Sequence, residues 1–281
     1  MMINRILLSV VFSIILIGLG TSASSSRAQT YSQLVLDADR VPWSSLVYRA
    51  RSFVVDVDVD VHLEYLSAGD VEAALIEARQ GTALQVPAQG AYRLSNDIVI
   101  DSIVQPPVKI SNQVWFDPKD ATALGRIRLR RGEDDFKKLY RFTQQGVFRH
   151  RIEPRDEQEA RQDPEGWSDV GDTFYAYNLD QLGCANVSER LLLIYFASAV
   201  EQFEDNKPLS LCVFAKRQLF QVKLESAGLH SLKVDYIEKN QQSIHQRKDK
   251  VDAHRIILES RPLESDLPKV ENFSFLGFHK N

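Results

Sequence analysis

The run Asp56-Val57-Asp58-Val59-Asp60 suggests a first candidate chemistry, because alternating carboxylates begin a calcium-binding loop. That twelve-residue loop also needs a glycine at its sixth position and a bidentate glutamate at its twelfth, where this chain has Val61 and Ser67. The intervening valines favour a strand, which holds alternate carboxylates about 7 Å apart on one face. We therefore expect a solvated acidic face and no metal site.

Gly125–Arg131 is the basic counterpart of this run, with Ile127 and Leu129 on one face and arginines on the other. Opposite charges on neighbouring strands stabilise a sheet modestly. We therefore hypothesise that the basic face pairs with the acidic face on an adjacent strand. The side chains concerned are Arg126, Arg128 and Arg130 on one strand and Asp56, Asp58 and Asp60 on the other.

Other catalytic chemistries lack their motifs. The sequence contains no HExxH pattern, GxSxG elbow, phosphate-binding loop or dinucleotide-binding glycine pattern. We predict no catalytic residues, no metal and no cofactor, while a hydrolase site assembled from distant residues stays an alternative. The scattered histidines are His62, His150, His230, His245, His254 and His279.

The N-terminus has the three parts of a secretory signal peptide. Met1–Arg5 contains one basic side chain, Ile6–Gly20 is a short apolar run, and small or polar residues lead to Ser-Arg-Ala before Gln29. The apolar run is shorter than the roughly 20 residues of a membrane span, although an uncleaved anchor is the alternative. No cysteine follows it, which excludes lipid attachment there. We predict cleavage after Ala28, or after Ala23, and a periplasmic or secreted protein.

Cys184 and Cys212 are the only cysteines in the sequence. In an oxidising compartment two cysteines usually pair. The bridge would close a loop of about 29 residues and contribute about 3 kcal/mol in the chain-entropy model. Two separate buried thiols are the alternative, and the CxxC spacing of a redox-active pair is absent.

Charge and length restrict the possible partners. Removing residues 1–28, which contain Arg5 and Arg27, leaves 32 basic against 38 acidic side chains, a net charge of −6. This mild acidity argues against a nucleic-acid partner. Leu191–Val200 is the longest remaining apolar stretch and is too short to span a membrane. We expect residues 29–281 to form a single β-rich domain without a transmembrane segment.

Period-two alternation predicts strands through most of the mature region, most clearly over Phe53–Tyr65. Glu153–Gly171 predicts a surface loop and Lys239–Asp249 a polar connection. The further predicted strands are Val71–Ala78, Ala91–Leu94, Ile98–Val104, Val108–Phe116, Gly125–Arg131, Phe136–Thr143, Val147–Ile152, Leu209–Ala215, Gln218–Ser226, Ser231–Glu238 and Ala253–Ser260.

One long helix is predicted over Val187–Phe203. Ser188 can cap it, and Glu189 suits its first turn. The middle of the segment is apolar nearly all round, so the sheet should enclose it. The predicted fold is therefore mainly β, an antiparallel curved sheet or open half barrel that encloses one long buried helix.

A resemblance to a known group of proteins lies in these segments: Asn112–Pro118, Arg128–Gly132, Leu139–Thr143 leading to Gly146-Val147, Leu211–Leu219, Val234–Tyr236 and Phe273–Phe278. They resemble a group of uncharacterised exported proteobacterial proteins, related to a larger family of β-rich envelope proteins with a domain of unknown function. The resemblance implies compartment and architecture and no site residues. In such proteins further strands follow the Phe-Leu-Gly segment, so the resemblance implies that a chain ending at Asn281 lacks a closing hairpin.

Trp43, Trp115 and Trp167 are expected to fill the core, or alternatively to line a pocket, since curved sheets with one apolar face can hold apolar ligands. We therefore expect a non-catalytic exported envelope protein that binds an apolar or lipid-like ligand or an envelope protein partner. A structural or assembly protein with a filled core is the first alternative. A hydrolase is the second.

Overall fold

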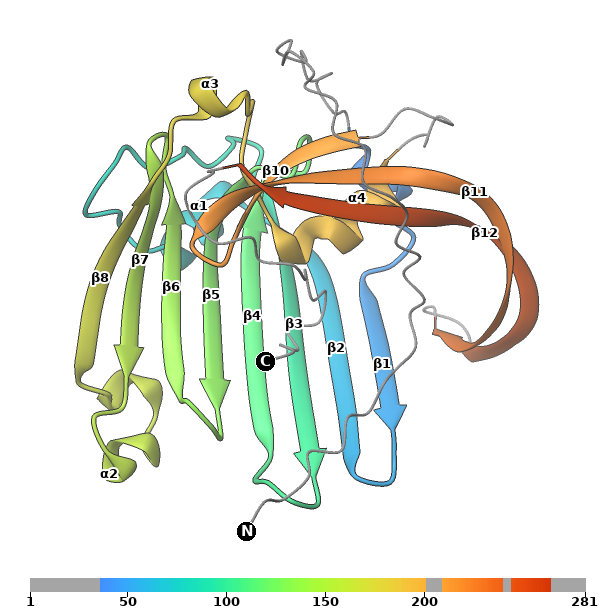
Figure 1. Ribbon diagram of the computed structural model, residues 1–281, viewed down its shortest axis with the longest axis horizontal. Coiled ribbons are helices and arrows are strands. Elements are labelled where there is room, and N and C mark those ends of the chain that lie inside the picture. Colours follow the sequence, from blue (N-terminus) through green and yellow to red (C-terminus); the bar gives the residue numbers. More distant parts are fainter. Residues whose placement is uncertain (1–35, 201–208, 240–243, 264–281) are drawn as a thin grey trace, which may run out of the picture. The chain divides into compact units, whose positions relative to one another are not determined.

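The computed structural model describes residues 36–200, 209–239 and 244–263. The predicted signal peptide, its cleavage site and the end of the chain at Asn281 lie outside the described residues. Two sheets make up most of the described chain (Figure 1), which confirms a mainly β, antiparallel fold. Within the described residues, no helix is long and apolar enough to cross a membrane.

The first sheet has eight strands in sequence order, each antiparallel to the next. It is open, with its first and eighth strands at the edges. The strands are β1 (Ser45–Arg51), β2 (Val55–Leu66), β3 (Ala91–Ser102), β4 (Val108–Phe116), β5 (Ala123–Arg131), β6 (Phe136–Phe142), β7 (Gly146–Glu153) and β8 (Asp169–Ala176).

The second sheet has four strands in the order β12-β11-β10-β9. Its long hairpin is antiparallel, while the short β9 runs parallel to β10. The strands are β9 (Ser188–Glu189), β10 (Leu209–Ala215), β11 (Gln218–Lys239) and β12 (Ile244–Pro262). The short helices are α1 (Ala68–Ala74), α2 (Glu157–Ala160), α3 (Leu179–Leu182) and α4 (Leu193–Ala199), with 3₁₀ turns at Ala38–Arg40 (η1), Pro164–Gly166 (η2) and Arg190–Leu192 (η3).

The alternation in β2 is confirmed. Val59, Val61 and Leu63 are buried, whereas Asp60 and Glu64 are exposed. We call the face of the eight-stranded sheet that carries Val59 the inner face and the opposite one the outer face. Strand register extends the inner face across the sheet, since side chains paired across a ladder share a face.

Several predicted boundaries are wrong. The predicted strand Val71–Ala78 is instead helix α1, because the Ser67 hydroxyl accepts a hydrogen bond from the Asp70 N–H and caps it. Two predicted strands merge into β3, and two more merge into β11 across a register shift at Gly228, whose φ is +84°. The predicted loop Glu153–Gly171 contains α2, η2 and the start of β8, and β12 begins inside the predicted connection Lys239–Asp249.

The predicted long helix Val187–Phe203 is also wrong. Ser188 and Glu189 form β9 through pairing with β10, so Ser188 caps no helix there. Glu189 instead caps η3, because its side chain accepts a hydrogen bond from the Leu191 N–H. Helix α4 is only seven residues long, and Val200 is extended. Residues 201–203 lie outside the described residues.

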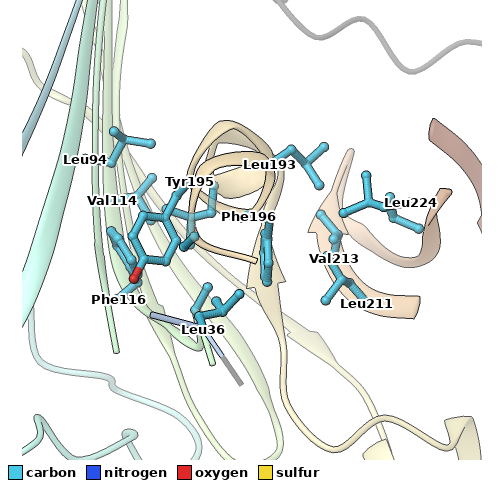
Figure 2. Packing of buried hydrophobic residues seen from close by; sticks show 14 of the residues in the cluster. Leu36, Leu94, Val114, Phe116, Leu193, Tyr195, Phe196, Leu211, Val213 and Leu224 are labelled. Atoms are coloured by element: carbon cyan, nitrogen blue, oxygen red, sulfur yellow. The ribbon is translucent and has the colours of Figure 1, made fainter. Parts of the chain in front are cut away.

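The enclosure expected of the apolar segment is nevertheless present. The side chains of α4 lie between the inner face and the second sheet (Figure 2). Tyr195 contacts Phe116 of β4 edge to face, with ring centroids 4.7 Å apart, and Phe196 faces the side of β10 and β11. Trp115 and Trp167 are buried, as expected of core residues, and Trp43 is partly buried against α4, where its indole N–H donates to Ser198 Oγ.

The predicted Cys184–Cys212 disulfide is confirmed, with an S–S distance of 2.03 Å. It ties the chain after α3 to β10, and so connects the region between the sheets to the second sheet. A disulfide of this kind fits an extracellular or periplasmic protein.

Candidate functional site

The hypothesis that the acidic and basic faces pair is wrong. Strands β3 and β4 separate β2 from β5, and the arginines of β5 lie on the inner face while the aspartates of β2 lie on the outer face. The aspartates of β2 instead form ion pairs with arginines of β1. Arg51 Nη2 lies 2.7 Å from Asp58 Oδ1, and Arg49 Nε lies 3.5 Å from the same oxygen. Arg51 Nε also lies 3.6 Å from Asp56 Oδ2.

No group of three His, Cys, Asp or Glu side chains that could hold a metal occurs among the described residues. His150 has an acidic partner on the outer face, with Nδ1 2.6 Å from Asp172 Oδ1. Asp172 also accepts a hydrogen bond from Arg79 at 2.6 Å. The hydrogen bond with His150 lowers the pKa of Asp172, and the charge of Arg79 adds to this. His150, Asp172 and Arg79 therefore form a group of hydrogen bonds and ion pairs on the outer face.

The inner face carries a group of cations where β5, β6 and β7 lie side by side. Two cross-strand rows contain them: Arg126 pairs with Tyr140, which pairs with Arg149. In the next row Arg128 pairs with Lys138, which pairs with Arg151. Arg190 of η3 directly follows Glu189, whose carboxylate pairs with Arg126, and the charge of Arg126 acts on Arg190. We call Arg126, Arg128, Lys138, Arg149 and Arg190 the cationic cluster.

Arg126 is the buried member of the cluster with a full ion pair. Its Nη1 donates to Glu189 Oε1 at 2.5 Å, and Glu189 is completely buried. The other carboxylate oxygen accepts from the Leu191 N–H at 2.6 Å. Glu189 therefore joins the sheet to the start of the segment that leads into α4.

The positive charges of Arg128 and Lys138 have few negative charges near them within the described residues. The Arg128 guanidinium lies 5.2 Å from the ring centroid of Phe136, and this arginine forms no ion pair within the described part of the chain. Burial lowers its pKa to about 10, with Arg126 and Arg190 acting in the same direction. Lys138 Nζ lies 3.5 Å from the Phe136 centroid and 3.8 Å from Glu153.

The amine of Lys138 is chemically unusual among these cations. Burial is the main cause that lowers its pKa to about 8; the charges of Arg128, Arg149 and Arg151 act in the same direction, while Glu153 opposes them. A bound anion would reduce the repulsion that these arginines exert on the Lys138 ammonium group.

Arg149 and Arg190 complete the cluster. Arg149 donates to Thr173 Oγ1 at 2.8 Å, and its guanidinium lies 5.3 Å from the ring centroid of Tyr175. In the described ranges the ion pairs of the β7 cations are those of His150 and Arg151, and Arg149 has none. Burial lowers the pKa of Arg190, and Arg126 adds to the effect. Within the described residues, these five cations form ion pairs with two carboxylates, those of Glu189 and Glu153, and Glu153 is shared with Arg151.

The turn between β10 and β11 lies near this cluster. Phe214, just before the turn, packs against Tyr175 and Tyr140 of the inner face, with ring centroids 5.6 and 6.5 Å apart. The turn residues Lys216 and Arg217 have φ of +48° and +73°. Two-residue hairpin turns of this kind favour Asn-Gly, because side chains other than these resist positive φ. Here both positions hold cations.

The cluster combines fixed N–H donors, excess positive charge and partial burial, which are the properties of a site for an oxyanion. It contains no histidine or cysteine that could act as a base or nucleophile, since its members are arginines and one lysine. Sequence analysis identified Arg126 and Arg128 but missed Lys138, Arg149 and Arg190. The alternation in the predicted hairpin 136–152 could have indicated Lys138 and Arg149, whereas Arg190 has no sequence signal.

Comparisons with known proteins found no family model, curated protein or solved structure that matches this chain.

Proposed function

We propose that this chain is a non-catalytic, exported protein of the bacterial envelope that binds an anionic ligand at the cationic cluster. The predicted signal peptide and the Cys184–Cys212 disulfide support export to an oxidising compartment. The observation that supports a negatively charged ligand is the excess of cations over carboxylates on one partly buried part of the inner face, among the described residues. An anion would offset the repulsion that the fold imposes there.

Preorganisation supports binding as the role of the cluster. The guanidinium groups of Arg126, Arg128 and Arg149 each lie over an aromatic ring, at 5.2 to 5.4 Å from its centroid. Stacking on a ring restricts an arginine side chain and leaves its N–H edge available for a planar, bidentate contact. Restricting these side chains before binding reduces the entropy lost on binding.

A lipid-like ligand fits this proposal only in an acidic form. The apolar part of the inner face packs against α4 and against β10 and β11, and the side chains there are nearly all buried (Figure 2). The protein's own residues thus occupy the position where an enclosed acyl chain would lie. We place the charged group of the ligand at the cationic cluster and no apolar chain within the core.

The same filled core favours a second candidate function, a structural or assembly role in the envelope. In that case the cations would serve a protein partner with an acidic surface, and no small ligand would accompany the purified protein. The two candidates therefore differ in what native mass spectrometry detects.

Native mass spectrometry of the mature protein purified from the envelope tests the proposal. We expect a bound acidic molecule on the wild type and its loss from the double variant Arg128→Gln/Arg149→Gln. A matched control, Arg49→Gln/Arg79→Gln, removes the same charge at side chains that are 71% and 70% exposed on the sheet's other side, and should retain the ligand. Repeated absence of any ligand, together with no anion binding by calorimetry, would contradict the proposal.

A further inference from the structure

We propose that the free edge of β12 pairs with the same edge of a second copy of this chain, so that the second sheets of both copies become one continuous sheet. This inference concerns an interaction surface and does not depend on the proposed anion site. β12 pairs with β11 on one side, and among the described residues no strand lies on its other side (Figure 1). The strand is 19 residues long, and a long edge strand is a template for a further strand.

The backbone of β12 directs hydrogen-bonding groups out of this edge. The Leu263 N–H donates to the Leu219 carbonyl oxygen at 3.0 Å, so in the unshifted ladder before it the odd-numbered residues direct their N–H and C=O groups toward β11. The backbone groups of Ile256 and Leu258 therefore point away from β11. Pro262 agrees with this direction, because a proline within a sheet lies where its missing N–H would face the open edge.

The charges near Ile257 are complementary to those of a second copy. Two copies of one strand pair antiparallel about a two-fold axis, and residues equally distant from the central residue then face each other. Arg255 lies two residues before Ile257 and Glu259 two residues after it. Both charged side chains are exposed, and neither forms an ion pair within the described residues. An axis through Ile257 would therefore form the same ion pair twice, Arg255 of each copy with Glu259 of the other, which stabilises antiparallel strands.

Centres on charged residues or on Ser260 are less favourable. An axis through a charged residue would place that charge against its own copy. An axis through Ser260 would pair Glu259 with Arg261. Arg261 Nε, however, already donates to Gln221 Oε1 at 2.6 Å. Such an axis would also place Pro262, which has no N–H, at a position that must donate a hydrogen bond.

Both faces of the paired strands would gain apolar contacts. The Ile257 side chain is 41% exposed, and at the centre it would meet its own copy. On the opposite face Ile256 and Leu258 are partly buried against the core between the sheets, and each would face the other across the axis. Pairing would therefore extend an existing apolar surface and cover side chains that the single copy leaves partly open.

Sedimentation velocity of the mature protein over a range of concentrations, with matched charge variants, tests the proposal. We expect the wild type to dimerise. Arg255→Glu should raise the dissociation constant at least about tenfold, because both symmetry-related pairs become repulsive. Glu259→Arg should do the same, whereas the double variant Arg255→Glu/Glu259→Arg should restore dimerisation. Lys250→Glu is the control, because it changes the charge of β12 equally but lies outside the paired residues 254–260.

A cysteine at the centre tests the register. Ile257 and its copy would form a pair without backbone hydrogen bonds, in which the Cα atoms lie about 4.5 Å apart, a distance that a disulfide can bridge. The native Cys184 and Cys212 are already paired with each other. Ile257→Cys should therefore form a covalent dimer on mild oxidation. Ile244→Cys, at an exposed position of β12 far from the axis, should form one much more slowly.

Other results would overturn the proposal. A wild type that stays monomeric at every concentration would refute it. A dimer that persists in both single charge variants, without a crosslink in Ile257→Cys, would refute this edge as the interface. A monomer in which the amide hydrogens of Ile256 and Leu258 exchange slowly would show that another segment of the same chain occupies the edge, and would also refute the proposal. None of these results bears on the anion site, which native mass spectrometry tests separately.

Discussion

Replacing Glu189 by glutamine should destabilise the fold far more than its conservative chemistry suggests. The carboxylate is completely buried, and it accepts hydrogen bonds from Arg126 at 2.5 Å and from the Leu191 N–H at 2.6 Å. Glutamine keeps the size and one acceptor oxygen, but it loses the charge and directs an amide N–H toward a donor. Arg126 would then be a buried cation beside Arg128 and Arg190 with no full counter-charge.

The magnitude follows from the burial of the pair. Removing one partner of a buried ion pair costs about 3–5 kcal/mol, and because the packing is retained we expect the lower end, about 3 kcal/mol. For a chain of this size that loss should lower the Tm by about 6–12 °C. The effect should be partly relieved in the double variant Arg126→Met/Glu189→Gln, because the unpaired cation is then gone as well.

Urea unfolding followed by tryptophan fluorescence measures this effect, since Trp115 and Trp167 are buried in the fold. Glu165→Gln is the matched control, because Glu165 pairs with Lys137 at 2.7 Å but its side chain is 71% exposed. Exposed pairs contribute little to stability, so the control should unfold almost as the wild type does. If Glu189→Gln and Glu165→Gln shift the unfolding midpoint equally, the argument that Glu189 neutralises the cluster is wrong.

Two further predictions concern the backbone and pH. Gly90→Ala should lower the free energy of unfolding by more than about 1 kcal/mol, because φ is +104° and a Cβ would lie 2.2 Å from the Leu66 carbonyl oxygen. The control Gly69→Ala in α1, where a Cβ would have nothing within 4 Å, should be neutral or stabilising. Equal unfolding midpoints for the two variants would contradict this. Lys138 has a pKa of about 8 in the fold, below its ordinary value of 10.5. The unfolded chain therefore binds more protons between those values, and stability rises with pH across that window. Lys138→Met lacks this gain, so its Tm relative to the wild type should fall on going from about pH 7.5 to about pH 9.5; parallel Tm curves would refute the lowered pKa.

Local patterns in the sequence identified much of the sheet. The strands Val108–Phe116 and Leu209–Ala215 have the bounds that alternation predicts, and the buried face of β2 is the predicted one. Alternation is a property of consecutive residues, because a strand sends them to opposite faces whatever its neighbours are. The disulfide was predictable for a similar reason, since two cysteines offer only one pairing.

The failures occurred where a distant segment decides the local structure. Ser188 and Glu189 would suit the start of a helix, but pairing with β10 and the ion pair with Arg126 hold them in an extended conformation. The acidic and basic faces carry the right charges to pair, but two intervening strands and opposite sides of the sheet keep them apart. Neither fact can be derived from the residues of one segment.

The sequence by itself indicated most of the strands from β2 to β7, the disulfide and the presence of a basic face on β5. Only the tertiary structure decided that this face, two residues of the next hairpin and Arg190 lie together. The physical reason is that alternation specifies on which side of a strand a charge lies, whereas strand order and packing determine which other charges it meets.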